Sequence, residues 1–383
     1  MLRSMVLVTL VASSILAFAD QNPVVDCDRG QSLTRTLANL HKSEAATVRF
    51  KGTCTEYVVI DGFDNLTLKG MSNAGIQQPA FDPPTSLILV VSVTASRSVT
   101  LSGFSVHSRP PAFSAIGISK GSTDVLVKQV TTDGSWGIVA YEASQVWLVR
   151  VMVNITSGYA AVSSFDKSDV HIVDGLLQGR PDSDWHAGVA ASSGHVTMQG
   201  TTIRDMQQGI AIGASGSVDL VNFDPTALGV DVIIDNPSGI NFSGAVVGDG
   251  SSLNISSAKL RISNAGQTWG GDTAAVFVTN GSTLNAGPNL VVTGSQGQGV
   301  IVSNGSHAQF GGSSITGGAR GGLVVVNLST VGVDFTNPLT VIASNGTDLF
   351  CDSRSQISGS ANIANAAVVQ CANLLLSNYE SLP

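Results

Sequence analysis

A short alternating pattern of apolar and polar residues returns along the sequence at a nearly constant interval. Six copies start 26, 21, 24, 26 and 22 positions apart, and they read Ser98-Val-Thr-Leu, Asp124-Val-Leu-Val, Gln145-Val-Trp-Leu, Asp169-Val-His-Ile, His195-Val-Thr-Met and Ser217-Val-Asp-Leu. After an irregular stretch the pattern resumes at Thr283, Ala308 and Thr330. A repeat of this length is typical of solenoids, in which every coil buries its apolar face against the next coil.

Each period contains two more short strands. The second strand is exemplified by Phe104-Ser-Val, Val151-Met-Val and Thr202-Ile-Arg, and the third by Gly137-Ile-Val-Ala, Gly209-Ile-Ala-Ile and Gly299-Val-Ile-Val. Three strands of period two in each coil predict three parallel sheets around one core. The Leu and Asn spacing of a leucine-rich repeat is missing. We therefore predict an all-β protein built as a single solenoid.

This pattern resembles the right-handed parallel β-helix family, also called the pectate-lyase-like or pectin lyase fold, over nearly the whole chain after residue 19. The segment that opens with Cys27-Asp-Arg-Gly-Gln-Ser-Leu also resembles that family, because it places Leu33, Leu37 and Leu40 on one face of a helix. The resemblance implies that this helix caps the first coil, whose strand edges would otherwise be exposed. We expect a cap and first coil over residues 20–60, the β-helix over 61–350 and a C-terminal cap over 351–383.

The chain opens like a secretory signal peptide. One basic residue, Arg3, precedes an apolar run that ends in Ala17-Phe18-Ala19, and we expect cleavage after residue 19. The run is too short to span a membrane, and no later segment reaches the required length. We therefore expect a secreted protein, extracellular or periplasmic, without a membrane span.

Charge narrows the possible partners. The formal net charge of -8 becomes -9 once Arg3 is removed, which disfavours nucleic acid and anionic membrane surfaces. Acidic polysaccharide would also be repelled unless a local basic cleft existed. Only 12% of the residues are charged whereas 43% are hydrophobic, so the chain should fold rather than stay disordered.

Four cysteines, Cys27, Cys54, Cys351 and Cys371, lie in pairs near the two ends of the sequence. Export favours disulfides over free thiols. Three pairings are possible, and we expect Cys27 with Cys54 and Cys351 with Cys371, since each pair would lie at one end of an elongated body. No CxxC spacing suggests a metal site.

The resemblance places a catalytic groove over the sheet formed by the third strands, bordered by the variable loops that precede them. Strand alternation predicts that the inward residues are Ile116, Ile118, Ile138, Ala140, Val162, Val189, Ile210 and Ile212. The outward rows are then Gly117, Val139, Ala161, Ala190 and Ala211, and beside them Ser119, Tyr141, Ser163, Ser192 and Gly213. Neither row holds a carboxylate, Arg or Lys.

Catalysis in the resembling family depends on charged motifs. Hydrolysis of a glycosidic bond generally needs two carboxyl groups, and the lyases use a basic residue with Ca²⁺ held by Asp clusters. The sequence has no Asp-Asp pair, Gly-His-Gly or Arg-Ile-Lys, and Arg109-Pro110-Pro111 lacks the second Arg of the lyase motif. We therefore expect a non-catalytic surface, adhesive or glycan-binding module. It should be a monomer whose partner is a polysaccharide or cell-surface glycan. We expect no cofactor; Ca²⁺ is the alternative, although no motif supports it.

The alternative is a polysaccharide lyase or glycoside hydrolase. Its site would use the loop Arg180-Pro-Asp-Ser-Asp-Trp-His186, with Asp182, Asp184 and His186 as catalytic candidates and Arg180 and Trp185 as ligand-binding residues. Neighbouring coils would add further ligand-binding residues, namely Asp133, Trp136, Tyr141 and Asp205. The same loop also reads as a polar surface turn.

Two further patterns have a structural interpretation. The outward row of the first strand, made of Thr100, Leu126, Trp147, His171, Thr197 and Asp219, suggests a solvated wall partly covered by a loop. A polar residue recurs where the second strand ends, at His107, Asp133, Asn154, Gln178 and Asp205. Eight Asn-x-Ser/Thr sequons occur, at Asn65, Asn154, Asn241, Asn254, Asn280, Asn304, Asn327 and Asn345. They are either glycosylation sites or products of a composition rich in Asn, Gly and Ser.

Overall fold

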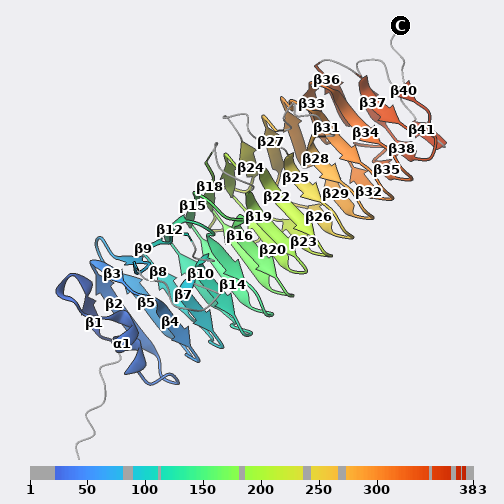
Figure 1. Cartoon of the computed structure of the whole chain (residues 1–383). Coiled ribbons are helices and arrows are strands. Elements are labelled where there is room, and N and C mark those ends of the chain that lie inside the picture. Colours follow the sequence, from blue (N-terminus) through green and yellow to red (C-terminus); the bar gives the residue numbers. More distant parts are fainter. Residues whose placement is uncertain are drawn as a thin grey trace, which may run out of the picture.

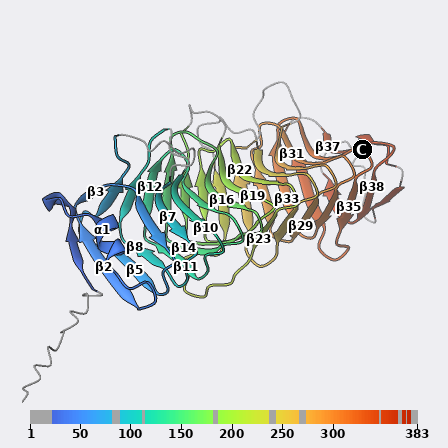
Figure 2. The ribbon, with the colours of Figure 1, turned by 60° about the horizontal axis from the view of Figure 1, so that its bottom comes forward.

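The computed structural model describes residues 22–80, 89–110, 114–180, 186–235, 243–265, 273–344, 347–363, 368–371 and 373–376. They form an elongated solenoid whose coils follow the sequence from one end to the other (Figure 1). The turned view in Figure 2 shows the sheets running along the length of this rod. The prediction of an all-β parallel β-helix with three sheets is confirmed. The predicted signal peptide, residues 1–19, lies outside the described residues.

Each coil adds one strand to sheet B, then one to sheet C, then one to sheet A. Within the described ranges, sheet A contains β1 (Val24–Asp26), β2 (Ala46–Lys51), β5 (Leu66–Gly70), β8 (Thr100–Ser102), β11 (Val125–Lys128), β14 (Gln145–Val149), β17 (Asp169–Val173), β20 (His195–Gln199), β23 (Ser217–Leu220), β26 (Ser252–Ile255), β29 (Thr283–Gly287), β32 (His307–Phe310), β35 (Thr330–Val333), β38 (Gln356–Gly359) and β41 (Asn373–Leu376).

Sheet B contains β3 (Thr53–Thr55), β6 (Gly75–Gln77), β9 (Ser105–His107), β12 (Thr131–Gly134), β15 (Met152–Ile155), β18 (Leu176–Gln178), β21 (Thr202–Arg204), β24 (Val232–Asp235), β27 (Leu260–Ser263), β30 (Leu290–Thr293), β33 (Ser314–Gly318), β36 (Leu339–Ala343) and β39 (Ala361–Ile363). Sheet C contains β4 (Val58–Asp61), β7 (Leu89–Thr94), β10 (Ser114–Ser119), β13 (Ile138–Ala140), β16 (Ala160–Phe165), β19 (Ala187–Ser192), β22 (Gln208–Gly213), β25 (Ser243–Val247), β28 (Ala274–Val278), β31 (Gln298–Val302), β34 (Gly321–Val325), β37 (Thr347–Cys351) and β40 (Val368–Val369).

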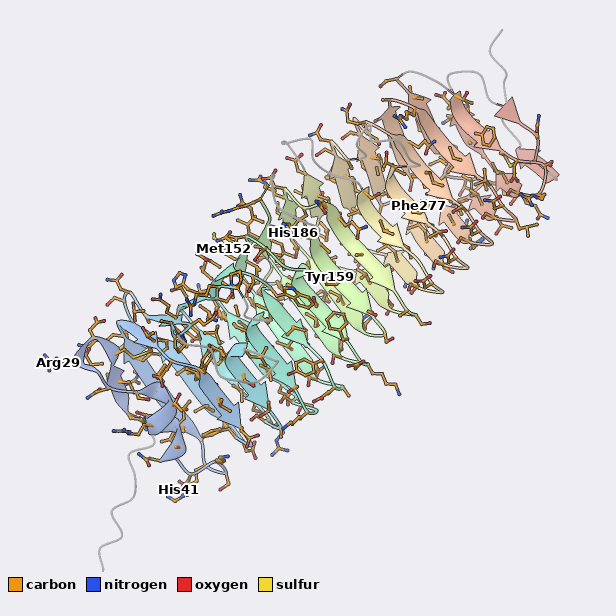
Figure 3. The ribbon with its side chains drawn as sticks, in the orientation of Figure 1. Arg29, His41, Met152, Tyr159, His186 and Phe277 are labelled. Atoms are coloured by element: carbon orange, nitrogen blue, oxygen red, sulfur yellow. A yellow bond between two sulfur atoms is a disulfide. The ribbon has the colours of Figure 1, made fainter. Side chains whose placement is uncertain are left out.

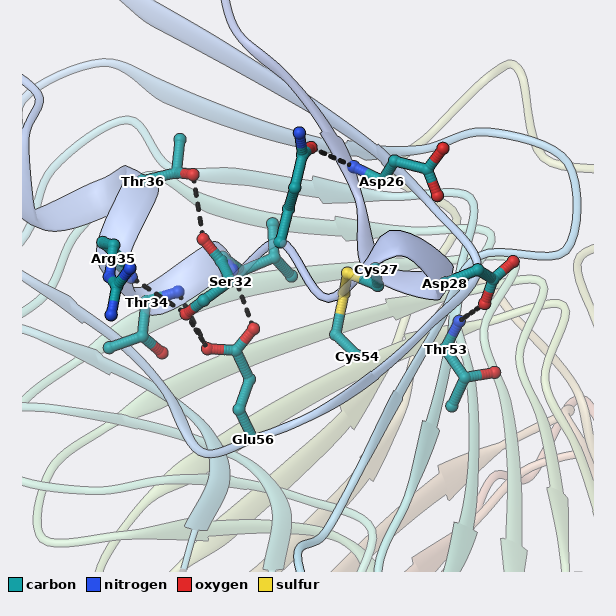
Figure 4. The surroundings of a disulfide bond; sticks show 12 residues. Asp26, Cys27, Asp28, Ser32, Thr34, Arg35, Thr36, Thr53, Cys54 and Glu56 are labelled. Carbon is teal, nitrogen blue, oxygen red and sulfur yellow. Dashed lines mark hydrogen bonds between the residues drawn. A yellow bond between two sulfur atoms is a disulfide. The ribbon is translucent and has the colours of Figure 1, made fainter.

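A short helix closes the first coil, as the sequence predicts. The turn η1 (Cys27–Arg29) leads to α1 (Leu33–Ala38), whose Leu33 and Leu37 are buried. Ser32 is the N-cap, with Oγ accepting a hydrogen bond from the Arg35 backbone N–H at 3.1 Å. Figure 4 shows Glu56 reaching back to this helix end, where its carboxylate accepts from the Leu33 N–H at 2.7 Å. A negative charge at a helix N-terminus is favourable.

Both predicted disulfides are present. Cys27 pairs with Cys54 beside the capping helix (Figure 4), and Cys351 pairs with Cys371 near the other end of the rod. The only close group of potential metal ligands among the described residues is Cys27, Cys54 and Glu56. Both sulfurs of that group belong to the disulfide, so the group is not a metal site.

The inward residues of sheet C stack in register to form one wall of the core. Ile116 pairs with Ile138, and the row continues through Val162, Val189 and Ile210. These side chains are at most 2% exposed, so the predicted inward assignment is confirmed. Strands beyond residue 210 continue the same row, and the core therefore extends along the whole described rod.

Two outward assignments in β16 are wrong. Ala161, the second residue of the strand, packs in the main core, whereas Ser163, predicted for the second outward row, pairs with Val139 and Ala190 in the first. Phe165 accordingly takes the next outward position, opposite Ser192. The strict alternation used for the prediction fails here because the chain bends at the corner and turns two successive residues inward.

Corners explain why the third strand often starts with Gly. A Cβ at Gly299 would overlap the Ile315 side chain of sheet B, and one at Gly322 would overlap Val341 in the same way. The backbone of sheet C approaches the interior of sheet B so closely at this corner that side chains larger than Ala rarely fit. The repeat of Gly along the sequence therefore reflects packing rather than turn flexibility.

A buried row of serine hydroxyls joins successive coils between sheets C and A. The backbone N–H of Ser282 donates to Ser306 Oγ at 3.2 Å, and Ser306 N–H donates to Ser329 Oγ at 3.3 Å. Ser329 N–H in turn donates to Ser355 Oγ at 3.3 Å. The same bond joins Ser144 to Ser168 at 3.0 Å in an earlier coil. We call this row the serine ladder; it satisfies buried N–H groups that no strand partner reaches.

The stretch between Ser217 and Thr283, where the sequence repeat is irregular, still forms regular coils in the described residues. The strand β26 pairs in register with β23 and β29, so it forms the coil that the sequence period had skipped. At the far end, β38 and β41 still pair in register, which extends sheet A past residue 351. None of the helices in the described part of the chain is long and apolar enough to cross a membrane.

Candidate functional site

The outer face of sheet C carries one row of side chains that runs along most of the rod. We call it the outer row; it consists of Gly117, Val139, Ser163, Ala190, Ala211, Val246, Phe277, Ile301, Val324 and Phe350. Gly, Ser and Ala predominate as far as Ala211, with Val139 the largest residue, whereas every residue from Val246 onward is Val, Ile or Phe. None of them is charged, in agreement with the prediction for the part of the row read from the sequence.

The first part of the outer row is covered by the protein itself. Val139, Ser163 and Ala190 are each 1% exposed although they point away from the core. Tyr159 packs against the alanines of this face, and its ring lies 5.3 Å from the ring of Trp136. We call this part, from β13 to β22, the covered region.

His186 helps to hold the cover in place. The side chain is fully buried, and its Nδ1 lies 3.0 Å from the Gly158 carbonyl oxygen, next to Tyr159 in the chain. Figure 3 shows Tyr159 and His186 close together midway along the rod, with Phe277 several coils further on. Burial and this backbone contact are typical of a structural histidine.

The second part of the outer row forms an open groove over β28, β31, β34 and β37. Its volume is about 460 Å³, and its floor is apolar, with Ile301 and Val324 between Phe277 and Phe350. Phe350 is 38% exposed. Aromatic and aliphatic side chains in a shallow groove provide a surface for the apolar face of a ligand ring. We call this part the open groove.

Polar groups line the edges of the open groove. Asn304 and Asn327 are held by hydrogen bonds: Asn304 Nδ2 donates to Thr279 Oγ1 at 3.0 Å, and Asn327 Nδ2 donates to Asn304 Oδ1 at 3.2 Å. Gln298 Oε1 is buried and has no hydrogen-bond partner among the described residues. Arg320 is the charged residue of the lining. The groove thus offers fixed amides around an apolar floor.

The structure brings only some of the predicted ligand-binding residues together. Asp133 and Arg180 line a depression of about 310 Å³ over sheet B, together with Asn154 and Gln178. Asp133 Oδ2 also lies 3.4 Å from His107 Nδ1. Asp182, Asp184 and Trp185 lie outside the described residues.

The remaining predicted residues lie apart from that depression. Trp136 precedes β13 and Tyr141 follows it, so the two occupy opposite edges of sheet C. Asp205 follows β21 in the left-handed backbone region, with φ of 52°. The polar position at the end of that strand belongs to Arg204, which pairs with Gln178 and Asp235, and the assignment of Asp205 to this row is therefore wrong.

Sheet A carries the second row that the sequence singled out. Trp147, His171, Thr197 and Asp219 lie in register on its outer face. Trp147 stacks on His171 at 4.2 Å between ring centroids, and Phe223 from the following loop lies 5.6 Å from Trp147. The predicted wall partly covered by a loop is confirmed.

A hydrogen-bonded loop and an ion pair stabilise this wall. The buried Gln199 amide oxygen accepts from the backbone N–H groups of Phe223 and Asp224 at 2.9 and 2.8 Å. Asp169 Oδ2 lies 3.1 Å from His171 Nε2. Burial pushes the pKa of Asp169 upward, but the His171 hydrogen bond and the charges of His171 and His195 outweigh it and leave that pKa below its usual value. These contacts indicate a structural role.

No family model and no curated protein matches the sequence. Among solved structures, the catalytic domain of a GH87 α-1,3-glucanase in complex with nigerose aligns with a TM-score of 0.62 at 11% identity, covering 94% of this chain and 69% of that one. A variant of the same domain, also with nigerose, aligns with a TM-score of 0.53 at 10% identity over 93% and 68% of the two chains. At such identity the likeness shows a shared parallel β-helix fold.

Proposed function

We propose that this protein is a secreted carbohydrate-binding module that holds a glycan in the open groove without cleaving it. The observation that carries the proposal is the combination of an apolar floor with hydrogen-bonding edges. A sugar ring presents C–H groups on its face and hydroxyls around its rim, and so matches such a surface. The two disulfides fit an oxidising, extracellular environment.

Three features of the groove support this ligand class. Phe277 and Phe350 provide flat apolar surfaces for sugar rings. Asn304 and Asn327 present amide groups beside the apolar floor, where they can exchange hydrogen bonds with ligand hydroxyls. The glucanase domain that shares this fold is in complex with nigerose. This likeness adds support for a carbohydrate ligand but does not carry the proposal.

The proposal for binding without cleavage rests on the chemistry of the groove lining. Glycosidases use a pair of carboxyl groups, and the described residues that line the open groove include no Asp, Glu or His. Binding should also be independent of metal, so EDTA should leave the affinity unchanged.

Titration calorimetry with a panel of linear neutral and uronic-acid oligosaccharides tests the proposal. Replacing Phe277 or Phe350 by Ala should weaken binding of the best ligand at least about tenfold, which is about 1.4 kcal/mol. Phe335→Ala is a matched control, because Phe335 is 64% exposed and lies outside the groove lining. Equal affinities for the three variants and the wild type would refute the groove as the binding site.

Carbohydrate cleavage at the sheet B depression is the second candidate function. The specific observation in its favour is that Asp133 and Arg180 line one depression, and that Arg180 directly precedes residues 181–185 in the sequence. This candidate predicts release of reducing ends or unsaturated products from a polysaccharide. Replacing Asp182 and Asp184 together should then abolish release, and a double variant with unchanged release would eliminate the site. His186 stays in place because it is fully buried and contacts the Gly158 carbonyl oxygen.

A further inference from the structure

Three sequons recur at one turn of successive coils, between sheets C and A. They are Asn280-Gly-Ser282, Asn304-Gly-Ser306 and Asn327-Leu-Ser329. All three asparagines adopt the left-handed backbone conformation, with φ of 55°, 56° and 58°. The serines of these sequons are the buried members of the serine ladder. Both residue types are therefore explained by the turn itself.

The asparagine side chains form a second ladder on the outside of the same turn. Asn280 Nδ2 donates to Asp249 Oδ1 at 3.0 Å, and Asn327 Nδ2 donates to Asn304 Oδ1 at 3.2 Å. Arg354 closes the row with a hydrogen bond to Asn327 Oδ1 at 2.9 Å. We call this row the asparagine ladder.

The asparagine of a fourth sequon is hydrogen-bonded in the same way on the outer face of sheet A. Asn254 Nδ2 donates to Asp219 Oδ1 at 2.7 Å, and Asn254 Oδ1 accepts from Asn285 Nδ2 at 2.7 Å. In all four sequons the amide nitrogen is thus a donor to a neighbouring coil. N-glycosylation uses that same nitrogen.

Two described sequons differ from these four. The difference is not one of exposure, because Asn65 is exposed as Asn280, Asn304 and Asn327 are, and Asn154 is half-buried on the outer face of sheet B as Asn254 is on sheet A. Neither side chain takes part in a ladder among the described residues. Asn65 has the left-handed conformation as well, with φ of 71°, so the turn alone does not distinguish it from the ladder asparagines.

We infer that Asn65 and Asn154 are the glycan-acceptor sites when this chain passes through a eukaryotic secretory pathway, and that the four ladder sequons remain unmodified in the folded protein. At an acceptor site the amide nitrogen forms a bond to C1 of the sugar and gives up one proton. The bond between C1 and the lipid-linked pyrophosphate breaks, and the pyrophosphate is the leaving group. This transfer precedes folding. A sugar on a ladder asparagine would replace a hydrogen of the amide nitrogen that donates to the next coil, and it would lie against the side chain that accepts this bond. We expect chains modified there to be excluded from the folded pool.

Glycan mapping of the full chain, secreted from yeast or insect cells, tests this inference. Enzymatic release of the glycans in heavy-oxygen water marks every formerly occupied Asn by mass. We expect the mark at Asn65 and Asn154 and its absence at Asn254, Asn280, Asn304 and Asn327. An unmarked Asn65 or Asn154, or a marked ladder asparagine in folded protein, overturns the inference.

A matched pair of variants tests the ladder without glycans. Asn304→Ala and Asn65→Ala both place Ala in a left-handed turn, so the backbone cost is nearly equal. Produced in a bacterial oxidising compartment, Asn304→Ala should melt at least about 2 °C lower than Asn65→Ala, because it also removes ladder bonds. Equal melting temperatures would show that the asparagine ladder contributes nothing.

Discussion

The covered region and the open groove occupy the same face of the same sheet, yet they distribute side-chain volume in opposite ways. In the covered region the outer row is small or medium-sized, and the connections from sheet B to sheet C carry Trp136, Tyr159 and His186. Along the open groove the outer row is large, and the connections 294–297 and 319–320 carry Gly, Ser, Gln, Ala and Arg. Among the described residues, the chain thus covers one half of the face with its own aromatic rings and leaves an open groove on the other half.

The largest effect should come from a charge on the inward side of the covered region. Ile210→Asp would bury an unpaired carboxylate in the core at a cost of several kcal/mol. We expect the variant to be misfolded or absent from the secreted fraction, as measured by yield and circular dichroism. Unaltered thermal unfolding would contradict the inward assignment.

The same substitution on the outer row should separate the two regions. Val139 is 1% exposed whereas Val324 lies on the floor of the open groove. Val139→Asp should therefore lose several kcal/mol of unfolding free energy, and Val324→Asp should lose little stability but most of the glycan affinity. Chemical denaturation and calorimetry measure both. If Val139→Asp and Val324→Asp lost equal unfolding free energy, Val324 would be as fully covered as Val139, which would contradict the open groove.

The serine ladder should matter equally in both regions. Ser306→Ala and Ser168→Ala each remove the acceptor of a buried backbone N–H, which costs about 1 to 3 kcal/mol. Urea denaturation of the two variants gives the comparison. A loss confined to one of them would mean that the coils are not equivalent.

The smallest effect should be a pH dependence that belongs to the wall on sheet A. The pKa of Asp169 is lower in the folded protein than in the unfolded chain, so its contribution to stability is present above the unfolded value of 3.8 and is lost as the pH falls through the folded pKa. On acidification below about pH 4, the Asp169→Asn variant should therefore lose less unfolding free energy than the wild type. Thermal unfolding at a series of pH values measures the difference. Parallel pH profiles would contradict this role.

The sequence was sufficient to predict the fold because the repeat follows directly from the way in which successive coils pack. Every coil must place an aliphatic residue on its neighbours, and residues such as Ile116, Ile138 and Ile210 satisfy this rule at a regular spacing. The disulfides followed from the elongated shape. The error at Ala161 arose because a corner breaks strand alternation, and alternation alone does not reveal corners.

The open groove was not predicted because its signal depends on long-range register. Phe277, Ile301 and Phe350 lie in one row only after coils with long loops have been stacked correctly. The clue was available in the third strands after Gly299 and Gly322, which carry large outward residues. Burial of the earlier outer row depends on Tyr159, which the sequence gives no reason to place over alanines.

Hydrogen–deuterium exchange with and without the tightest-binding oligosaccharide of the panel tests the central claim most directly, because it reports on both regions in one experiment. The account predicts slower exchange in β31, β34 and the connection 319–320, with unchanged exchange in β13, β16 and β19. Protection confined to β13, β16 and β19, in the presence of saturating ligand, would contradict it.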